Sequence, residues 1–167
     1  MRILGIDPGY AIIGWGVIQY DSGRFHAQDF GAVTTEAGTP FSQRLNQIYD
    51  QLTAILTQFA PDAMAIEKLY FQNNQKTAIE VAEARGVILL AAERCGVPVF
   101  EYTPLQVKSA VTGFGQAQKP QVMEMTRRLL RLQAVPKPDD TADALAIAIC
   151  HAQTGGTALK LRIMKGR

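Results

Sequence analysis

The chain has 167 residues but only two cysteines, Cys95 and Cys150, and their positions do not have the spacing of metal ligands. Each lies within an apolar helical pattern, so we expect both to be buried free thiols of a protein in the reducing cytoplasm. A run of about 18 apolar residues is also missing, which argues against a membrane span. No charged segment is followed by a long apolar one, which argues against a signal peptide.

The chain also lacks a strong net charge, with 17 basic and 15 acidic side chains, but the two signs are unevenly distributed. Residues 1–100 carry ten acidic and seven basic side chains, whereas residues 101–167 carry five acidic and ten basic ones. A basic C-terminal part is compatible with a polyanionic partner without demonstrating one. At this length we expect one domain with a substantial core.

The chain begins with an apolar segment, Ile3 to Ile6, that ends in a carboxylate, Asp7, and is stopped by Pro8-Gly9. Two further strands are predicted over 12–20 and 25–35, with a turn at Asp-Ser-Gly between them. The first three elements therefore favour an antiparallel meander. Asp7 could simply cap the turn, or it could belong to a functional site at the end of a central strand.

A helix is predicted over 42–59, from apolar residues at intervals of three and four, and a short strand over 63–67 ends in a second carboxylate, Glu67. Strand, helix and strand imply a crossover, so the strand at 63–67 can lie parallel to the first. If the two are neighbours, Asp7 and Glu67 end side by side on strands about 4.8 Å apart. Further along, a helix over 77–95, a strand over 97–102 and helices over 104–111 and 121–132 are expected.

The last predicted helix, 141–153, is apolar almost throughout, yet Asp143 lies inside it and Asp140 lies three residues earlier. Residues at this spacing share one face of a helix, where two like charges repel. Helix capping explains this pair well, but it does not explain why two strands also end in acids. Four clustered carboxylates are reasonable if divalent cations bind them, and all-oxygen ligands favour Mg²⁺ or Mn²⁺. We expect Asp7 to bridge two such ions, and His151 to be a residue of the helix end and not a catalyst.

Three motifs together resemble the RuvC family of bacterial Holliday-junction resolvases. They are Gly-Ile-Asp-Pro-Gly at 5–9, Ala-Ile-Glu at 65–67 and Asp-Asp-Thr-Ala-Asp-Ala-Leu-Ala-Ile-Ala at 139–148. The resemblance implies an α/β fold of the RNase H-like type, with a five-stranded mixed sheet flanked by helices. In that sheet strands 1–3 are antiparallel and strands 4–5 are parallel. It also implies a nuclease domain at 1–155, and we expect a basic, mobile tail at 156–167.

The resemblance further implies a Mg²⁺-dependent endonuclease that makes paired symmetric cuts in four-way DNA junctions during recombination and repair. Such an enzyme would be a homodimer with two Mg²⁺ per active site, replaceable by Mn²⁺, and would work with the RuvA–RuvB branch-migration complex. By this resemblance the catalytic, metal-binding acids are Asp7, Glu67, Asp140 and Asp143. Asp139 matches a non-catalytic position.

Four residues are predicted to contact DNA: Tyr70, Lys76, Lys108 and Lys119. Tyr70 matches an aromatic that wedges into the junction, and the two later lysines match lysines near the cut, with Lys119 expected in a glycine-containing loop. Two alternatives stay open from the sequence. One is another RNase H-like nuclease, acting on RNA or simple duplexes, and the other is an ATP-binding protein of the actin and sugar-kinase fold. A junction-binding module without catalysis is disfavoured, because clustered acids would only repel DNA.

Overall fold

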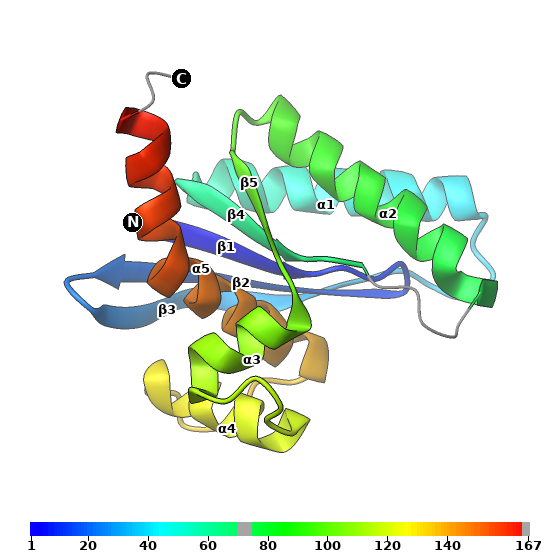
Figure 1. Ribbon diagram of the computed structural model, residues 1–167. Coiled ribbons are helices and arrows are strands. Elements are labelled where there is room, and N and C mark those ends of the chain that lie inside the picture. The colour runs from blue at the N-terminus through cyan, green and yellow to red at the C-terminus, as the bar shows by residue number, and fades with distance from the viewer. Residues whose placement is uncertain (70–74, 165–167) are drawn as a thin grey trace.

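The computed structural model describes residues 1–69 and 75–164; for residues 75–76 and 156–164 it describes the backbone alone. The strands and helices follow one another as β1 (Arg2–Asp7), β2 (Ile12–Asp21), β3 (Arg24–Thr34), α1 (Phe41–Phe59), β4 (Ala63–Glu67), α2 (Gln75–Arg94), β5 (Val99–Tyr102), α3 (Pro104–Thr112), α4 (Lys119–Leu129) and α5 (Asp139–Met164) (Figure 1). Within the described ranges, no helix is both long and apolar enough to cross a membrane.

The five strands form one mixed sheet in the order β3-β2-β1-β4-β5. β1, β2 and β3 pair antiparallel, whereas β4 pairs parallel with both β1 and β5, so the predicted sheet is confirmed. Ile6 of β1 lies opposite Ile66 of β4. Asp7 and Glu67, one residue further on, therefore leave the sheet next to each other, as the crossover predicts.

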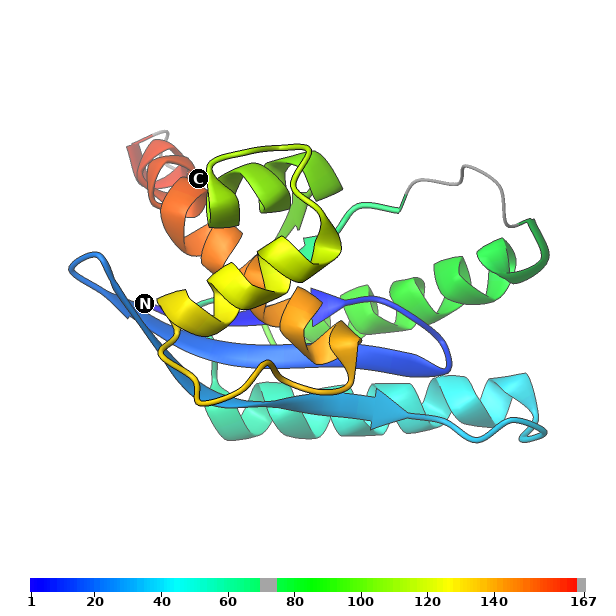
Figure 2. The ribbon, with the colours of Figure 1, turned by 90° about the horizontal axis from the view of Figure 1, so that it is seen from below.

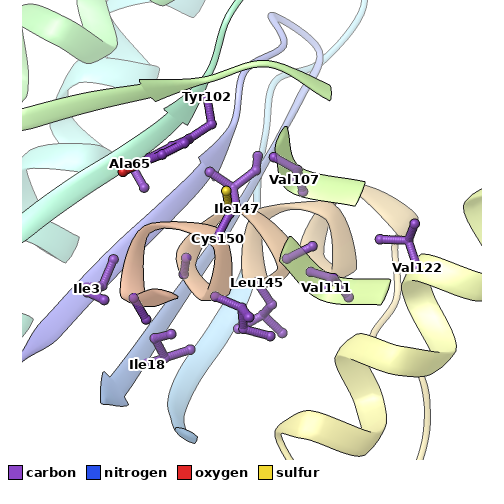
Figure 3. Packing of buried hydrophobic residues seen from close by; sticks show 14 of the residues in the cluster. Ile3, Ile18, Ala65, Tyr102, Val107, Val111, Val122, Leu145, Ile147 and Cys150 are labelled. Carbon is purple, nitrogen blue, oxygen red and sulfur yellow. The ribbon is translucent and has the colours of Figure 1, made fainter. Parts of the chain in front are cut away.

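Alternation along the strands divides the core into two layers. Leu4 and Ile6 of β1 are fully buried among residues of α1 and α2, whereas Ile3 is fully buried on the opposite face among residues of α3, α4 and α5. Figures 1 and 2 show α1 and α2 on one side of the sheet and α5, with α3 and α4 beyond it, on the other. In Figure 3, Leu145 and Ile147 of α5 lie between the strands and the inner side chains of α3.

α5 lies unusually close to the sheet because the strand positions beneath it are glycines. A Cβ atom at Gly5 would lie 2.0 Å from the carbonyl oxygen of Ala144, and one at Gly14 would lie 1.9 Å from that of Asp140. At Gly16 it would lie 2.5 Å from a methyl group of Leu145. The helix backbone therefore occupies the space that side chains would need, and glycines on adjacent strands β1 and β2 are what permits this contact.

Two predicted helix boundaries and the predicted burial of one cysteine were wrong. The last helix was expected to end near Gln153 but continues to Met164, because the weak helix propensity of glycine at 155–156 does not end it. Lys119 is the first residue of α4 and not a loop residue, since Pro120 sits in the first helical turn, where proline is well tolerated. Cys95 is partly exposed, whereas Cys150 is buried as expected. Whether 156–167 forms a separate mobile tail stays a prediction, and residues 165–167 lie outside the described residues.

The glycine contacts predict that Gly5→Ala is destabilising, although alanine normally suits an ordered position better than glycine. The added methyl group must push α5 away from β1, and overpacking of this kind costs about 1–3 kcal/mol. Urea unfolding followed by circular dichroism measures the change in the free energy of unfolding. The control is Gly86→Ala in α2, where a Cβ atom meets nothing within 4 Å; it should raise stability by up to about 1 kcal/mol. Equal effects of both substitutions would contradict the close contact.

Candidate active site

Two carboxylates of the site come from the ends of adjacent parallel strands. In β1, Ile3 and Gly5 face α5, so alternation turns Asp7 toward the same side. In β4, Ala65 belongs to the core layer of α5, and Glu67 follows two residues later. Both acids are partly buried, and both belong to the face of the sheet that α5 covers.

α5 brings the other two carboxylates over these strand ends. Gly14 lies directly opposite Asp7 in the β1–β2 ladder, and it is also the point at which the backbone of Asp140 touches the sheet. Thr141 fastens the same turn, because its hydroxyl donates a hydrogen bond of 3.0 Å to the carbonyl oxygen of Gly31 in β3. The first turn of α5 is thus held above the end of β1, and Asp143 follows almost one turn further along.

The electrostatics show that these four acids form one group. The pKa of Asp7 is raised to about 8, first by burial and then by the negative charges of Asp143, Glu67 and Asp140. Burial and Asp143 also raise the pKa of Glu67, and burial raises that of Asp143. The predicted convergence of the four carboxylates is therefore present in the structure. Gathering them costs free energy, because each ionised group is partly desolvated and repels its neighbours.

Lys119 partly compensates this negative charge. Its Nζ lies 2.9 Å from Oδ2 of Asp143 and 3.8 Å from Oδ2 of Asp139. The ion pair raises the pKa of Lys119 and opposes the rise for Asp143. In the part of the chain that the structure describes, no three histidine, cysteine, aspartate or glutamate side chains are arranged to hold a metal ion. The ammonium group is the cation that Asp143 meets in this arrangement.

A cavity of about 250 Å³ opens beside the acids. Glu67, Asp143, Lys108 and Lys119 contribute its charged wall, and the rest of the lining is mostly apolar: Pro104, Val107, Val122, Ala146 and Ile147. The charge of Lys108 lowers the pKa of Glu67, which places this lysine near the acids as well. Two of the four predicted DNA contacts, Lys108 and Lys119, therefore border the same hollow as the carboxylates.

The chemistry of the donor set fits divalent cations that prefer oxygen ligands. The four acids offer only carboxylate oxygens, which suit Mg²⁺ or Mn²⁺ better than zinc. The pKa of Asp7, raised first by burial and then by neighbouring charges, has the same implication, because a nearby cation would offset both effects on the ionised carboxylate. A group of acids held together at such a cost on rigid strands and a helix is typical of a functional site and not of a stabilising one.

Three further sequence predictions concern Tyr70, Lys76 and His151. Tyr70 lies outside the described residues, as does the side chain of Lys76. His151 was expected near a helix end, but it lies within α5 and is 1% exposed. The sequence analysis missed Gly14, which sets the position of Asp140. A signal was available, since glycines at 14 and 16 weaken a strand and point to a close backbone approach.

Comparison with known proteins identifies the family. The family described as "Crossover junction endodeoxyribonuclease RuvC" matches residues 3–151. The RuvC of Brevibacillus brevis is 57% identical over 153 residues, which cover 92% of each chain. That of Ruminiclostridium cellulolyticum is 51% identical over 154 residues, covering 92% of this chain and 93% of the relative.

Solved structures agree with this result. The structure of Thermus thermophilus RuvC superimposes with a TM-score of 0.87 at 36% identity, covering 95% of this chain and 97% of that one. The structure of the same protein in complex with a Holliday junction substrate superimposes with a TM-score of 0.86 at 34% identity, covering 94% of this chain and 96% of that one. The yeast mitochondrial Holliday junction resolvase Ydc2, at 15% identity and a TM-score of 0.66, shares the fold. From the four converging carboxylates, the mixed sheet and these matches, we conclude that the chain belongs to the RuvC family of crossover junction endodeoxyribonucleases.

Proposed function

We propose that this protein resolves four-way DNA junctions by paired, symmetric, Mg²⁺-dependent hydrolysis of phosphodiester bonds. The observation that carries the proposal is the convergence of Asp7, Glu67, Asp140 and Asp143, seen in the charges of the other three acids that add to burial in raising the pKa of Asp7. Support for the substrate comes from the Thermus thermophilus relative, whose structure contains a Holliday junction substrate. Family membership favours this function over the ATP-binding alternative.

The four carboxylates would hold two Mg²⁺ ions per active site, and Mn²⁺ would substitute because it accepts the same ligands. When bound, such a pair supplies an activated water and stabilises the charge on the attacking and leaving oxygens. Asp7 is the acid best placed to contact both ions, because the charges of the other three all act on it. The scaffold would fix these acids in advance, so that little reorganisation accompanies the reaction.

Lys108 and Lys119 would hold the phosphates of the cleaved strand. Both border the cavity beside Glu67 and Asp143. Lys119 is 53% exposed, so its ammonium group can exchange the Asp143 carboxylate for a DNA phosphate. Tyr70 and Lys76 remain predicted contacts, with Tyr70 stacking on an unpaired base, which is worth about 1–3 kcal/mol.

Two coordinated cuts need two active sites, so the working form would be a homodimer. α2 exposes two large apolar side chains, Ile79 at 68% and Leu90 at 52%, which is consistent with a partner surface on this helix. The junction would be presented by a RuvA–RuvB branch-migration complex in the cytoplasm, during recombination and repair. Incubation with a mobile four-way junction, a linear duplex and an RNA–DNA hybrid separates this function from that of other nucleases of the same fold.

Asp7→Asn should retain junction binding and lose cutting. The change removes a charged oxygen from the centre of the group. Losing even a residue that only orients a metal ligand typically lowers metal affinity or activity about 10–100-fold. We therefore expect a loss of more than about 100-fold in the single-turnover rate in Mg²⁺, with unchanged mobility shifts in EDTA. Asp139→Asn is the matched control, since this neighbouring acid pairs with Lys137 and should be dispensable. Cutting by Asp7→Asn at the wild-type rate would refute the mechanism.

The raised pKa of Asp7 predicts a pH dependence of stability in metal-free protein. A carboxyl whose pKa is higher in the folded state binds its proton more tightly there than in the unfolded chain. The free energy of unfolding of the wild type should therefore fall as the pH rises from about 4 through about 8. The Asp7→Asn variant should lack this contribution, because it has no carboxyl at position 7.

Thermal unfolding in EDTA measures this effect. The excess of Tm in Asp7→Asn over the wild type should grow between pH 5 and pH 8, by about 2–4 °C per kcal/mol for a chain of this size. Asp139→Asn should show no such growth, because a hydrogen bond from Lys137 lowers the pKa of Asp139. A difference in Tm between Asp7→Asn and the wild type that stays constant with pH would mean that the pKa of the Asp7 carboxyl is not raised in the folded protein.

Lys108→Gln and Lys119→Gln should weaken junction binding in a salt-dependent way. If each lysine contacts one phosphate, the slope of log binding constant against log salt concentration should fall by about 1 per substitution. Titrations in EDTA at several salt concentrations measure the slope. Arg94→Gln, in the last turn of α2, serves as the control and should leave the slope unchanged. Identical slopes for all variants would exclude the two lysines as phosphate contacts.

A further inference from the structure

His151 is a buried polar residue that the proposed reaction does not use. It lies in α5 among apolar neighbours and is 1% exposed. Its Nδ1 atom lies 2.7 Å from the hydroxyl of Tyr102, and its ring centroid lies 4.6 Å from that of Phe100. A Cβ atom at Gly155, one turn later, would lie 2.5 Å from Cε1 of the ring. The imidazole is thus packed on several sides and oriented by a hydrogen bond.

Both partners of this hydrogen bond are neutral in the working pH range. Burial lowers the pKa of His151 to about 4 and raises that of Tyr102. When the proton of the neutral imidazole is on Nε2, the Tyr102 hydroxyl donates to Nδ1, and when it is on Nδ1, the ring donates to the hydroxyl oxygen. Loss of the Tyr102 hydroxyl would leave Nδ1 of the buried imidazole unsatisfied, whereas the hydroxyl itself also meets the side chain of Thr154.

The bond connects the two parts of the scaffold that carry the catalytic acids. Tyr102 is the last residue of β5 and lies opposite Glu67 in the parallel ladder with β4. The backbone N–H of Lys68 donates to the carbonyl oxygen of Tyr102 at 2.8 Å, so the ends of these two strands are held together. His151 lies eight residues beyond Asp143 in the same helix, about 12 Å along its axis.

The closest approach of α5 to the sheet, near the catalytic acids, is made at glycine positions. Gly5 and Gly14 let the helix come close to the sheet, but they present no side chains that would interlock with it. Contacts at these positions set how near the helix lies, and they resist sliding or rotation less than interdigitated side chains do. A hydrogen bond whose length and direction are both restricted supplies that resistance further along the helix.

We propose that His151 and Tyr102 are positioning residues, whose hydrogen bond sets the separation between Asp143 on α5 and Glu67 on β4. The proposal rests on the proposed role of these acids as metal ligands. Glu67 and Asp143 already lie close enough for Asp143 to raise the pKa of Glu67. A small rotation or shift of α5 would move Asp143 relative to Glu67 and leave the fold and the DNA-facing lysines in place.

The test compares His151→Leu and Tyr102→Phe, which each remove one partner, with His151→Asn, whose side-chain oxygen can accept in place of Nδ1. Binding of Mn²⁺ to the DNA-free protein is measured by electron paramagnetic resonance. Junction binding in EDTA and single-turnover cutting at increasing metal concentration are measured at a temperature well below every Tm.

We expect the dissociation constant for Mn²⁺ to rise about 10–100-fold in His151→Leu and Tyr102→Phe, as for other contacts that orient metal ligands. The rate of cutting should fall at low metal concentration and recover toward the wild-type rate at saturation. Junction binding in EDTA should be unchanged, and His151→Asn should restore at least part of the Mn²⁺ affinity.

A matched control separates positioning from general loss of stability. Ile48→Ala removes buried volume from α1, in the core layer on the other face of the sheet. It should lower Tm by as much as His151→Leu or more, and leave Mn²⁺ affinity unchanged. Wild-type Mn²⁺ affinity in both His151→Leu and Tyr102→Phe would overturn the proposal, as would an equal loss of affinity in Ile48→Ala.

Glu67→Gln distinguishes failure of this proposal from failure of the proposed function. If Glu67→Gln weakens Mn²⁺ binding while His151→Leu and Tyr102→Phe do not, the acids are ligands and the positioning role is wrong. If Glu67→Gln itself leaves Mn²⁺ affinity and cutting unchanged, the metal site is wrong and the positioning role is refuted with it.

Discussion

The close approach of α5 to the sheet is the constraint on which the site depends. Asp7 and Glu67 are fixed by strand pairing, but Asp140 and Asp143 reach them only because α5 touches the backbone of β1 and β2. Side chains at Gly5 and Gly14 would hold the helix away from the strands. Asp140 and Asp143 would then lie away from Asp7 and Glu67, and the four carboxylates would not form one group.

That arrangement places function and stability in opposition. The residues that bring α5 close also bring partly buried carboxylates together, and the resulting desolvation and repulsion raise the pKa of Asp7 to about 8. Two apolar layers offset this cost, with Ile3 and Leu4 fully buried on opposite faces of one strand. Active sites that hold like charges commonly lower stability in this way, and a rigid core is what keeps such an arrangement from relaxing.

Much of this fold could be predicted because its signals are local. Apolar runs that end in Asp7 and Glu67 mark two strand ends, and the helix between them requires a crossover that makes the strands parallel. The features that could not be predicted depend on tertiary contacts. The burial of His151 depends on packing against Phe100 and Tyr102 of β5, to which no pattern within residues 141–164 points. The contact of Gly14 with Asp140 likewise joins residues 126 positions apart.

The charges around the acids suggest why DNA and metal ions would bind together. In the structure, Lys119 is held by Asp143, so both its charge and that of the carboxylate are partly neutralised. A phosphate that approached the four acids without cations would meet net repulsion, whereas cations among the acids would reverse that field. They would also compete with Lys119 for Asp143. The ion pair that stabilises the metal-free site would thus compete with the phosphate for Lys119, a proposed DNA contact.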